Sequence, residues 1–222
     1  MLYLGLDLGQ AADYSALAVV EEPIYAPPFG GWVSGASLDA EQRRSYERLA
    51  YEWQQLAPGK PPLWLRGLHR YPLRTPYPDV VADVLRRLGG RDAYRPDAVL
   101  VIDGTGVGAG VVDLFRYGDL PCELRPVIIH GGVKVVIDRG LHVPKRDLIG
   151  AVQVVLHTGR LQVARQSDVT DLWAKEMQNY QMKLTDSGHD TYNARGDSRH
   201  DDLVLGVALA VWLREYRNRG AE

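Results

Sequence analysis

Three observations in the sequence predict a mixed α/β fold, in which helices flank a central sheet. Apolar runs of strand length recur along the chain, and two of them, residues 2–6 and 98–102, are each followed directly by an aspartate. Longer segments with apolar residues at helical spacing alternate with these runs, and glycine or proline turns separate the two kinds of segment. Strands that alternate with helical segments are typical of a sheet joined partly by crossover helices.

The first two expected strands form a hairpin, because the short turn at residues 9–13 joins them. The first strand is expected to be central, and Pro126 is expected to limit how far a later strand pairs on both sides. The expected elements, in chain order, are strands at 2–8, 15–20 and 63–71, a helix at 78–88, a strand at 98–102, a helix at 111–115, a strand at 124–129, and helices at 147–157, 169–180 and 203–216. This order predicts an antiparallel region that continues into a parallel sheet.

The length of 222 residues favours a single domain, residues 1–222. Within it, the segment at 23–62 is rich in proline and glycine near both ends and has apolar residues at helical spacing between them. It is therefore interpreted as an insertion that carries one amphipathic helix. A polar stretch at 185–199 is expected to be a loop or an exposed hairpin.

Composition excludes several classes of protein. With 45% hydrophobic and 24% charged residues, the chain is not expected to be disordered. Its single cysteine excludes an internal disulfide and any cysteine-based zinc spacing. The N-terminus reaches Asp7 too soon for the apolar core of a signal peptide, and the apolar run at 203–213 is too short to cross a membrane, so the expected location is the cytoplasm. The net charge of −2 gives no overall basic footprint for nucleic acid, although clustered arginines such as Arg66, Arg70 and Arg74 are candidates to line a phosphate-binding groove.

Acidic residues stand at the ends of three expected elements. Asp7 and Asp103 each follow an apolar strand, and Asp201 and Asp202 open the last apolar run. Carboxylates from distant parts of the chain repel one another when they meet, unless a divalent cation neutralises them. The pattern therefore predicts a cation site, with Asp202 as the inward residue of the last pair and Asp201 as its rival. Structural aspartates in turns, and acids that complement the dipole of the last helix, are the alternative interpretation.

Glycines after Asp103 could cradle a phosphate at a helix start, or simply allow close packing of strand and helix. No lysine follows them, and no Gly-x-x-x-x-Gly-Lys-Ser/Thr sequence occurs in the chain, which excludes a P-loop motor within it. Lys145 and Arg146, expected just before a helix, are candidates to contact a phosphate near the acids, and His200 is a candidate to hold a phosphate or move a proton.

Taken together, five motifs resemble the nuclease domain of the large terminase subunit of tailed phages. They are Gly5-Leu6-Asp7-Leu8-Gly9 with Ser15, Val101-Ile102-Asp103-Gly104-Thr105-Gly106-Val107-Gly108, Val143-Pro144-Lys145, Gly159-Arg160-Leu161, and His200-Asp201-Asp202-Leu203-Val204 with Ala208 and Trp212. Each motif is weak alone, but their order and spacing make the set specific, and together they span nearly the whole chain.

The resemblance implies a ribonuclease H-like fold and a metal-dependent endodeoxyribonuclease. On that basis Asp7, Asp103 and Asp202, supplemented by Asp201, would bind two divalent ions, Mg²⁺ or Mn²⁺, and carry catalysis. Members of the family cut concatemeric viral double-stranded DNA during genome packaging, in the cytoplasm of the bacterial host. The implied partners are double-stranded DNA, a terminase ATPase motor in the same or a separate polypeptide, the portal and the small terminase subunit, with no membrane.

Three other functions stay open at this point. A resolvase of Holliday junctions would share the sheet and the acids, and differ in preferring a four-way junction. An actin-like ATPase or sugar kinase would share the glycine motifs at Asp7 and Asp103, but needs two lobes and a longer chain. A scaffold without catalytic activity would share the fold, but would have no use for all four acids together.

Overall fold

The computed structural model describes residues 1–9, 13–22, 61–89, 97–138, 140–163, 167–186 and 200–219. Its strands are β1 (Leu2–Asp7), β2 (Ala16–Glu21), β3 (Leu63–Arg70), β4 (Ala98–Asp103), β5 (Glu123–His130), β6 (Val136–Ile137), β7 (Leu141–Pro144) and β8 (Leu161–Val163). Its helices are α2 (Tyr77–Arg87), α3 (Gly108–Tyr117), α4 (Lys145–His157), α5 (Asp168–Asp186) and α6 (Asp202–Arg219). The expected insertion at 23–62 lies outside the described residues, apart from its last two.

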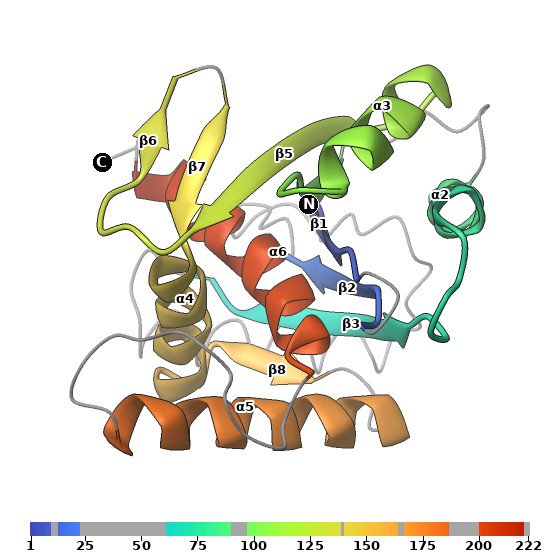
Figure 1. Ribbon diagram of the computed structural model, residues 1–222. Coiled ribbons are helices and arrows are strands. Elements are labelled where there is room, and N and C mark those ends of the chain that lie inside the picture. The colour runs from blue at the N-terminus through green and yellow to red at the C-terminus, as the bar shows by residue number, and fades with distance from the viewer. Residues whose placement is uncertain are drawn as a thin grey trace, which may run out of the picture.

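All eight of these strands join one mixed sheet, in the order β6-β7-β5-β4-β1-β2-β3-β8 (Figure 1). β1, β2 and β3 form an antiparallel meander, and β4 lies parallel to β1 on its other side. β5 and β7 continue the parallel part, and β8 lies parallel to β3 at the far edge. A central strand with a meander on one side and parallel strands on the other, flanked by helices, gives the chain a ribonuclease H-like fold, as the sequence motifs implied.

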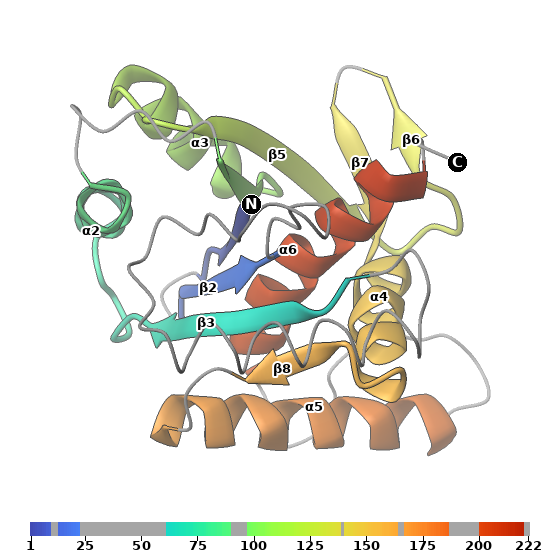
Figure 2. The ribbon, with the colours of Figure 1, turned by 180° about the vertical axis from the view of Figure 1, so that it is seen from behind.

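The alternation of side chains along β1 and β4 divides the core between the two faces of the sheet. Leu4 and Leu6 point to the face that α2 and α3 cover, together with Leu100 and Ile102 of β4. Tyr3 and Val101 point to the opposite face, which α4, α5 and α6 cover (Figure 2). By the same alternation, the aspartates that end the two strands leave the sheet on the side of α6.

A contact between two glycines sets the distance of α6 from the sheet. A Cβ atom built on Gly5 of β1 would lie 1.9 Å from the carbonyl oxygen of Gly206 in α6. No side chain fits there, so the helix backbone rests directly on the strand backbone. Gly206 lies one helical turn after Asp202, and Gly5 two residues before Asp7. The contact therefore holds the start of α6 beside the end of β1.

Buried ion pairs fix the other end of α6. Arg160, which is fully buried, donates a hydrogen bond to Glu215 at 2.8 Å, and Arg214 donates one to the same carboxylate at 2.7 Å. Arg214 also donates to Glu22, beyond the end of β2, at 2.6 Å. These charges are paired, as buried charges must be, and Glu215 at their centre lies 13 residues along the helix from Asp202.

Most of the expected elements are confirmed, and the differences have local causes. β6, β7 and β8 were not predicted, because strands of two to four residues show too little alternation to be recognised. Lys145 and Arg146 were expected just before a helix that begins at Asp147; instead Pro144 occupies the N-cap position, and both residues lie in the first turn of α4. Pro126 pairs towards β4, whereas pairing with β7 begins at Val127, so the proline limits the ladder as expected. Among the described residues no helix is long and apolar enough to cross a membrane.

Candidate active site

Asp7 and Asp103 come together because their strands are parallel neighbours in register. Leu6 pairs with Ile102, so the next residue of each strand is an aspartate at the same edge of the sheet. Asp7 is only 6% exposed, whereas Asp103 is half-buried at the rim. The expectation that these two acids share one site depends on this register, and the register brings them side by side.

The turn after β4 orients the Asp103 carboxylate. The backbone N–H of Thr105 donates to Asp103 Oδ1 at 2.8 Å, and the Thr105 hydroxyl accepts a hydrogen bond from the N–H of Ile129 in β5 at 2.8 Å. A third bond, from the N–H of Gly104 to the carbonyl of Val127, ties the turn to β5 at 2.8 Å. Close packing is also present, since a Cβ on Gly108 would lie 1.9 Å from the carbonyl oxygen of Asp103.

Asp201 and Asp202 lie at the start of α6, and they differ in burial as the sequence suggested. Asp202 is the inward residue, 4% exposed, and its Oδ2 accepts a hydrogen bond from Arg70 at 2.8 Å. Asp201 is half-buried, its backbone carbonyl accepts the first hydrogen bond of the helix from Leu205, and its Oδ2 accepts one from Lys145 Nζ at 2.7 Å. The two acids thus face different basic side chains.

The electrostatics of Asp7 show that the four acids share one region. Burial raises the pKa of Asp7 well above its ordinary value, and the negative charges of Asp103, Asp202 and Asp201 raise it further, while Lys145 opposes them. Burial also raises the pKa of Asp103 against the effect of its bonds with Thr105, and that of Asp202 against the effect of Arg70. A site that resists the ionised form of its own acids favours an added cation.

Sequence reasoning missed Glu176 of α5, which lies next to this cluster. Glu176 is 8% exposed, and Arg70 Nη2 lies 3.1 Å from its Oε1. Burial raises the pKa of Glu176 to about 7, with the charge of Arg70 acting in the opposite direction and that of Asp202 adding to it. A glutamate in the middle of an ordinary amphipathic helix belongs to no sequence motif. Its position next to the acids is therefore seen only in the folded structure.

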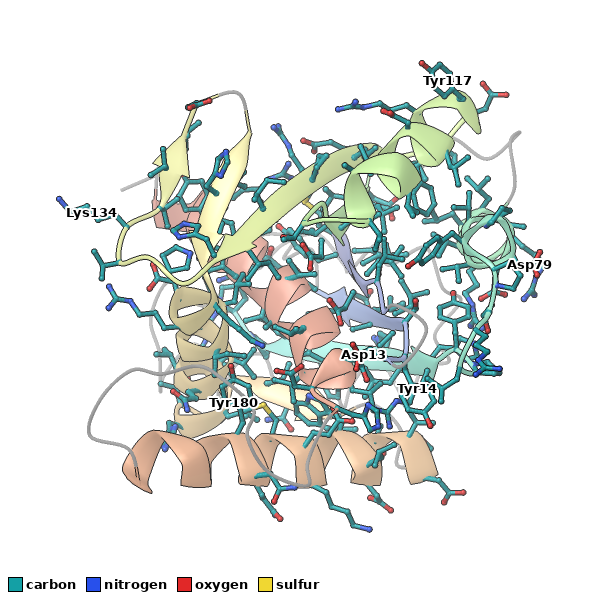
Figure 3. The ribbon with its side chains drawn as sticks, in the orientation of Figure 1. Asp13, Tyr14, Asp79, Tyr117, Lys134 and Tyr180 are labelled. Atoms are coloured by element: carbon teal, nitrogen blue, oxygen red, sulfur yellow. The ribbon has the colours of Figure 1, made fainter. Side chains whose placement is uncertain are left out.

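Two other candidates have different outcomes. His200 lies near the acids: its Nδ1 is 3.9 Å from Asp202 Oδ2, and its ring meets the edge of Tyr14 with centroids 4.8 Å apart. Figure 3 shows Tyr14 and Asp13 beside the first turn of α6. Arg146 turns instead towards the segment before β6, where it donates a hydrogen bond to the carbonyl of Val133 at 2.6 Å. The structure gives Arg146 no contact with the four acids.

The carboxylate groups of this site are suitable ligands for divalent cations, although they are not already arranged around a common metal position. Within the described ranges no three or more His, Cys, Asp and Glu side chains are arranged as a metal site. Arg70 and Lys145 balance Asp202 and Asp201 instead. Carboxylate oxygens are the ligands that hard cations such as Mg²⁺ and Mn²⁺ take, and Asp7 is buried against three further acids. The donor set therefore fits such ions, which would compete with the two basic side chains.

A pocket of about 200 Å³ lies between Gly9, which follows β1, and the turn that follows β3. The turn after β3 forms one wall, with Arg74 and Tyr77, and the residues around Gly9 and Ser15 form the other. The Tyr77 hydroxyl joins the two walls by donating a hydrogen bond to the Gly9 carbonyl at 2.9 Å, and within the second wall the Gly9 N–H donates to Ser15 Oγ at 3.2 Å. Gly9 is two residues beyond Asp7 in the chain, but none of the four acids lines the pocket.

No protein-family model matches the chain, and no curated protein does. Two solved structures are similar to it, both of the large terminase nuclease from the thermophilic phage G20c. The crystal structure with bound zinc has 17% sequence identity and a TM-score of 0.47, over 95% of this chain and 79% of the other. A second crystal structure has 19% identity and a TM-score of 0.48, over 95% of this chain and 80% of the other. Both are the kind of protein that the sequence motifs resemble.

Proposed function

We propose that this chain is a metal-dependent endodeoxyribonuclease that uses two divalent ions, Mg²⁺ or Mn²⁺, to hydrolyse phosphodiester bonds of double-stranded DNA. One observation supports this above all: Asp7, Asp103, Asp201 and Asp202 come from two strands and a helix far apart in sequence and converge on one sheet edge. Structural roles do not require four acids to gather where each raises the cost of ionising its neighbour.

Each acid has a distinct part in this proposal. Asp7 forms the buried floor, Asp103 is held at the rim by Thr105, and Asp202 presents its carboxylate from the fixed start of α6. When bound, a pair of divalent ions lowers the pKa of an attacking water and stabilises the leaving oxygen. Lys145, whose ammonium group lies 2.7 Å from Asp201 Oδ2, would contact a phosphate oxygen once Asp201 engages a cation.

The biological setting proposed for this activity is the packaging of phage DNA, as the sequence motifs imply. With a net charge of −2, the chain is expected to bind DNA modestly and with strong salt dependence. A packaging motor, in the same or a separate polypeptide, would raise the local concentration of DNA at the site. The portal and the small terminase subunit are the further partners proposed.

Digestion of supercoiled plasmid tests the proposal directly. We expect the purified protein to nick or linearise the plasmid with Mn²⁺, and EDTA to abolish this. Asp103→Ala is expected to lose at least about a hundredfold in rate, since it removes an acid on which the proposed chemistry depends. Asp113→Ala is the matched control, because Asp113 lies exposed on α3 and pairs only with Arg116 among the described residues.

The alternatives predict different results in the same assay. Cutting that persists in EDTA, or an Asp103→Ala variant as active as the control, would refute the two-ion mechanism. A Holliday-junction resolvase would cut a four-way junction in preference to a linear duplex of the same sequence. Binding of ATP in calorimetry, without plasmid cleavage, would indicate an actin-like ATPase or sugar kinase.

A further inference from the structure

Arg70, the last residue of β3, lies between two carboxylates that belong to different helices. Its Nη2 donates to Asp202 Oδ2 at 2.8 Å and lies 3.1 Å from Glu176 Oε1. The guanidinium also lies over the ring of Tyr14, 4.1 Å from its centroid. One nitrogen therefore serves both acids, and the ring beneath it restricts where the guanidinium can move.

The buried surroundings of Glu176 leave Arg70 as its main ion-pair partner. The side chain is buried in the face of α5 that also carries Trp173 and Met177 of the core. The ion pair with Arg70 is the main compensation for its charge, and the backbone N–H of Val204 in α6 favours the ionised carboxylate to a smaller degree. A buried carboxylate in this position is costly and does nothing for the packing of α5 that a methionine or glutamine could not do.

The arrangement matters because Arg70 would otherwise neutralise Asp202. The formal charges of Asp202, Arg70 and Glu176 leave one negative charge, whereas Asp202 and Arg70 without Glu176 leave none. Cation binding at Asp202 falls as that local charge approaches zero. Glu176 is thus the partner that can retain Arg70 when a cation takes Asp202.

We propose that Glu176 is a positioning residue: by sharing Arg70 with Asp202, it prevents Arg70 from neutralising that acid and keeps Asp202 available to a divalent cation. The inference rests on the proposed function, because it assigns Asp202 to cation binding. Glu176 itself does not contact the DNA or the reacting atoms. It acts on the site through Arg70, from a helix in which sequence patterns indicate no functional residue.

Calorimetric titration of the metal-free protein with Mn²⁺ alone, at a pH above 8 where a carboxyl group with a pKa of about 7 is ionised, tests this without relying on cleavage. Glu176→Gln is expected to bind Mn²⁺ about tenfold more weakly, a change of about 1.4 kcal/mol in binding free energy. Arg70→Gln is expected to bind it more tightly, because it leaves two negative charges. The double variant Arg70→Gln/Glu176→Gln restores one negative charge, so its affinity should return close to that of the unmodified protein.

Glu215→Gln is the matched control, since Glu215 is a half-buried glutamate that is also paired with arginine, at the opposite end of α6. It should lower the melting temperature without changing the affinity for Mn²⁺. Unchanged affinity in Glu176→Gln, or a double variant as weak as the single one, would overturn the role of Glu176 while leaving the nuclease intact. An unmodified protein that neither binds Mn²⁺ nor cuts plasmid would overturn the proposed function, and the role of Glu176 with it.

Discussion

Substitution of Gly5 by alanine tests whether the backbone contact between β1 and α6 builds the site. The added Cβ would lie 1.9 Å from the carbonyl oxygen of Gly206 and 3.0 Å from the backbone nitrogen of Ala210. Since Cβ contacts below 3.0 Å essentially do not occur, strand and helix must separate by about 1.1 Å, the difference between 3.0 and 1.9 Å. Overpacking of this kind costs about 1–3 kcal/mol, and rigid backbone on both sides favours the upper end or beyond.

The same displacement should be visible in activity. Asp202 precedes Gly206 by one turn, so a shift of α6 moves it relative to Asp7. A misplacement of about 1 Å can reduce a rate by about a hundredfold. We therefore expect Gly5→Ala to lower the urea midpoint in EDTA and to cut plasmid with Mn²⁺ about a hundredfold more slowly.

Gly206→Ala is the control across the same contact. Its Cβ would lie 3.3 Å from the carbonyl oxygen of Gly5 and 3.4 Å from that of Ala16, which requires a shift of only a few tenths of an ångström. Alanine also favours a helix over glycine by about 1 kcal/mol, which offsets this strain. Wild-type stability and cleavage in Gly5→Ala, or equal damage from Gly206→Ala, would show that the contact does not position the acids.

Two further predictions concern stability. Arg74 adopts a positive φ of 64°, a backbone conformation that glycine tolerates and arginine does not favour. We therefore expect Arg74→Gly to raise the free energy of unfolding in urea by up to about 1 kcal/mol, and Arg74→Ala to leave it without this gain. Equal effects of the two substitutions would contradict this reasoning. Burial raises the pKa of Glu176 from 4.5 to about 7, so between these values the folded state holds a proton that the unfolded chain has released. The contribution of Glu176 to stability should therefore be greatest near pH 4.5 and be lost as the pH rises through 7. The measurement is the free energy of unfolding of the metal-free protein minus that of Glu176→Gln, and this difference should fall over the same pH range. A difference that stays constant with pH would argue against the raised pKa of Glu176.

Much of the site could be predicted because two of its acids stand at the ends of strands that are recognisable in the sequence. Asp7 and Asp103 are recognisable since each terminates an apolar run, and parallel neighbours place such ends at one edge. The inward position of Asp202 was also inferred correctly, because adjacent helical residues point about 100° apart and only one can face the sheet. These features are local in sequence, and their meeting follows from topology.

The rest depends on long-range packing that no local pattern encodes. Arg70 was one of several clustered arginines, and nothing near it distinguished the one that pairs with Asp202 across 132 positions. Glu176 resembles any polar residue of an amphipathic helix until α5 packs beside β3. Lys145 was proposed to contact a phosphate, and in the structure its ammonium group lies at Asp201, because α4 begins two residues earlier than its apolar pattern indicated.

The burial of α6 decides how this site could be controlled. Residues 202–214 are buried throughout, between the sheet and α4 and α5. Such a helix does not detach by local fluctuation, and its amide hydrogens should exchange with solvent only when the whole chain opens. An inhibitor or partner therefore has no easy route to withdraw Asp202. Control has to act on what is allowed to reach the acids, by covering the sheet edge or by withholding DNA.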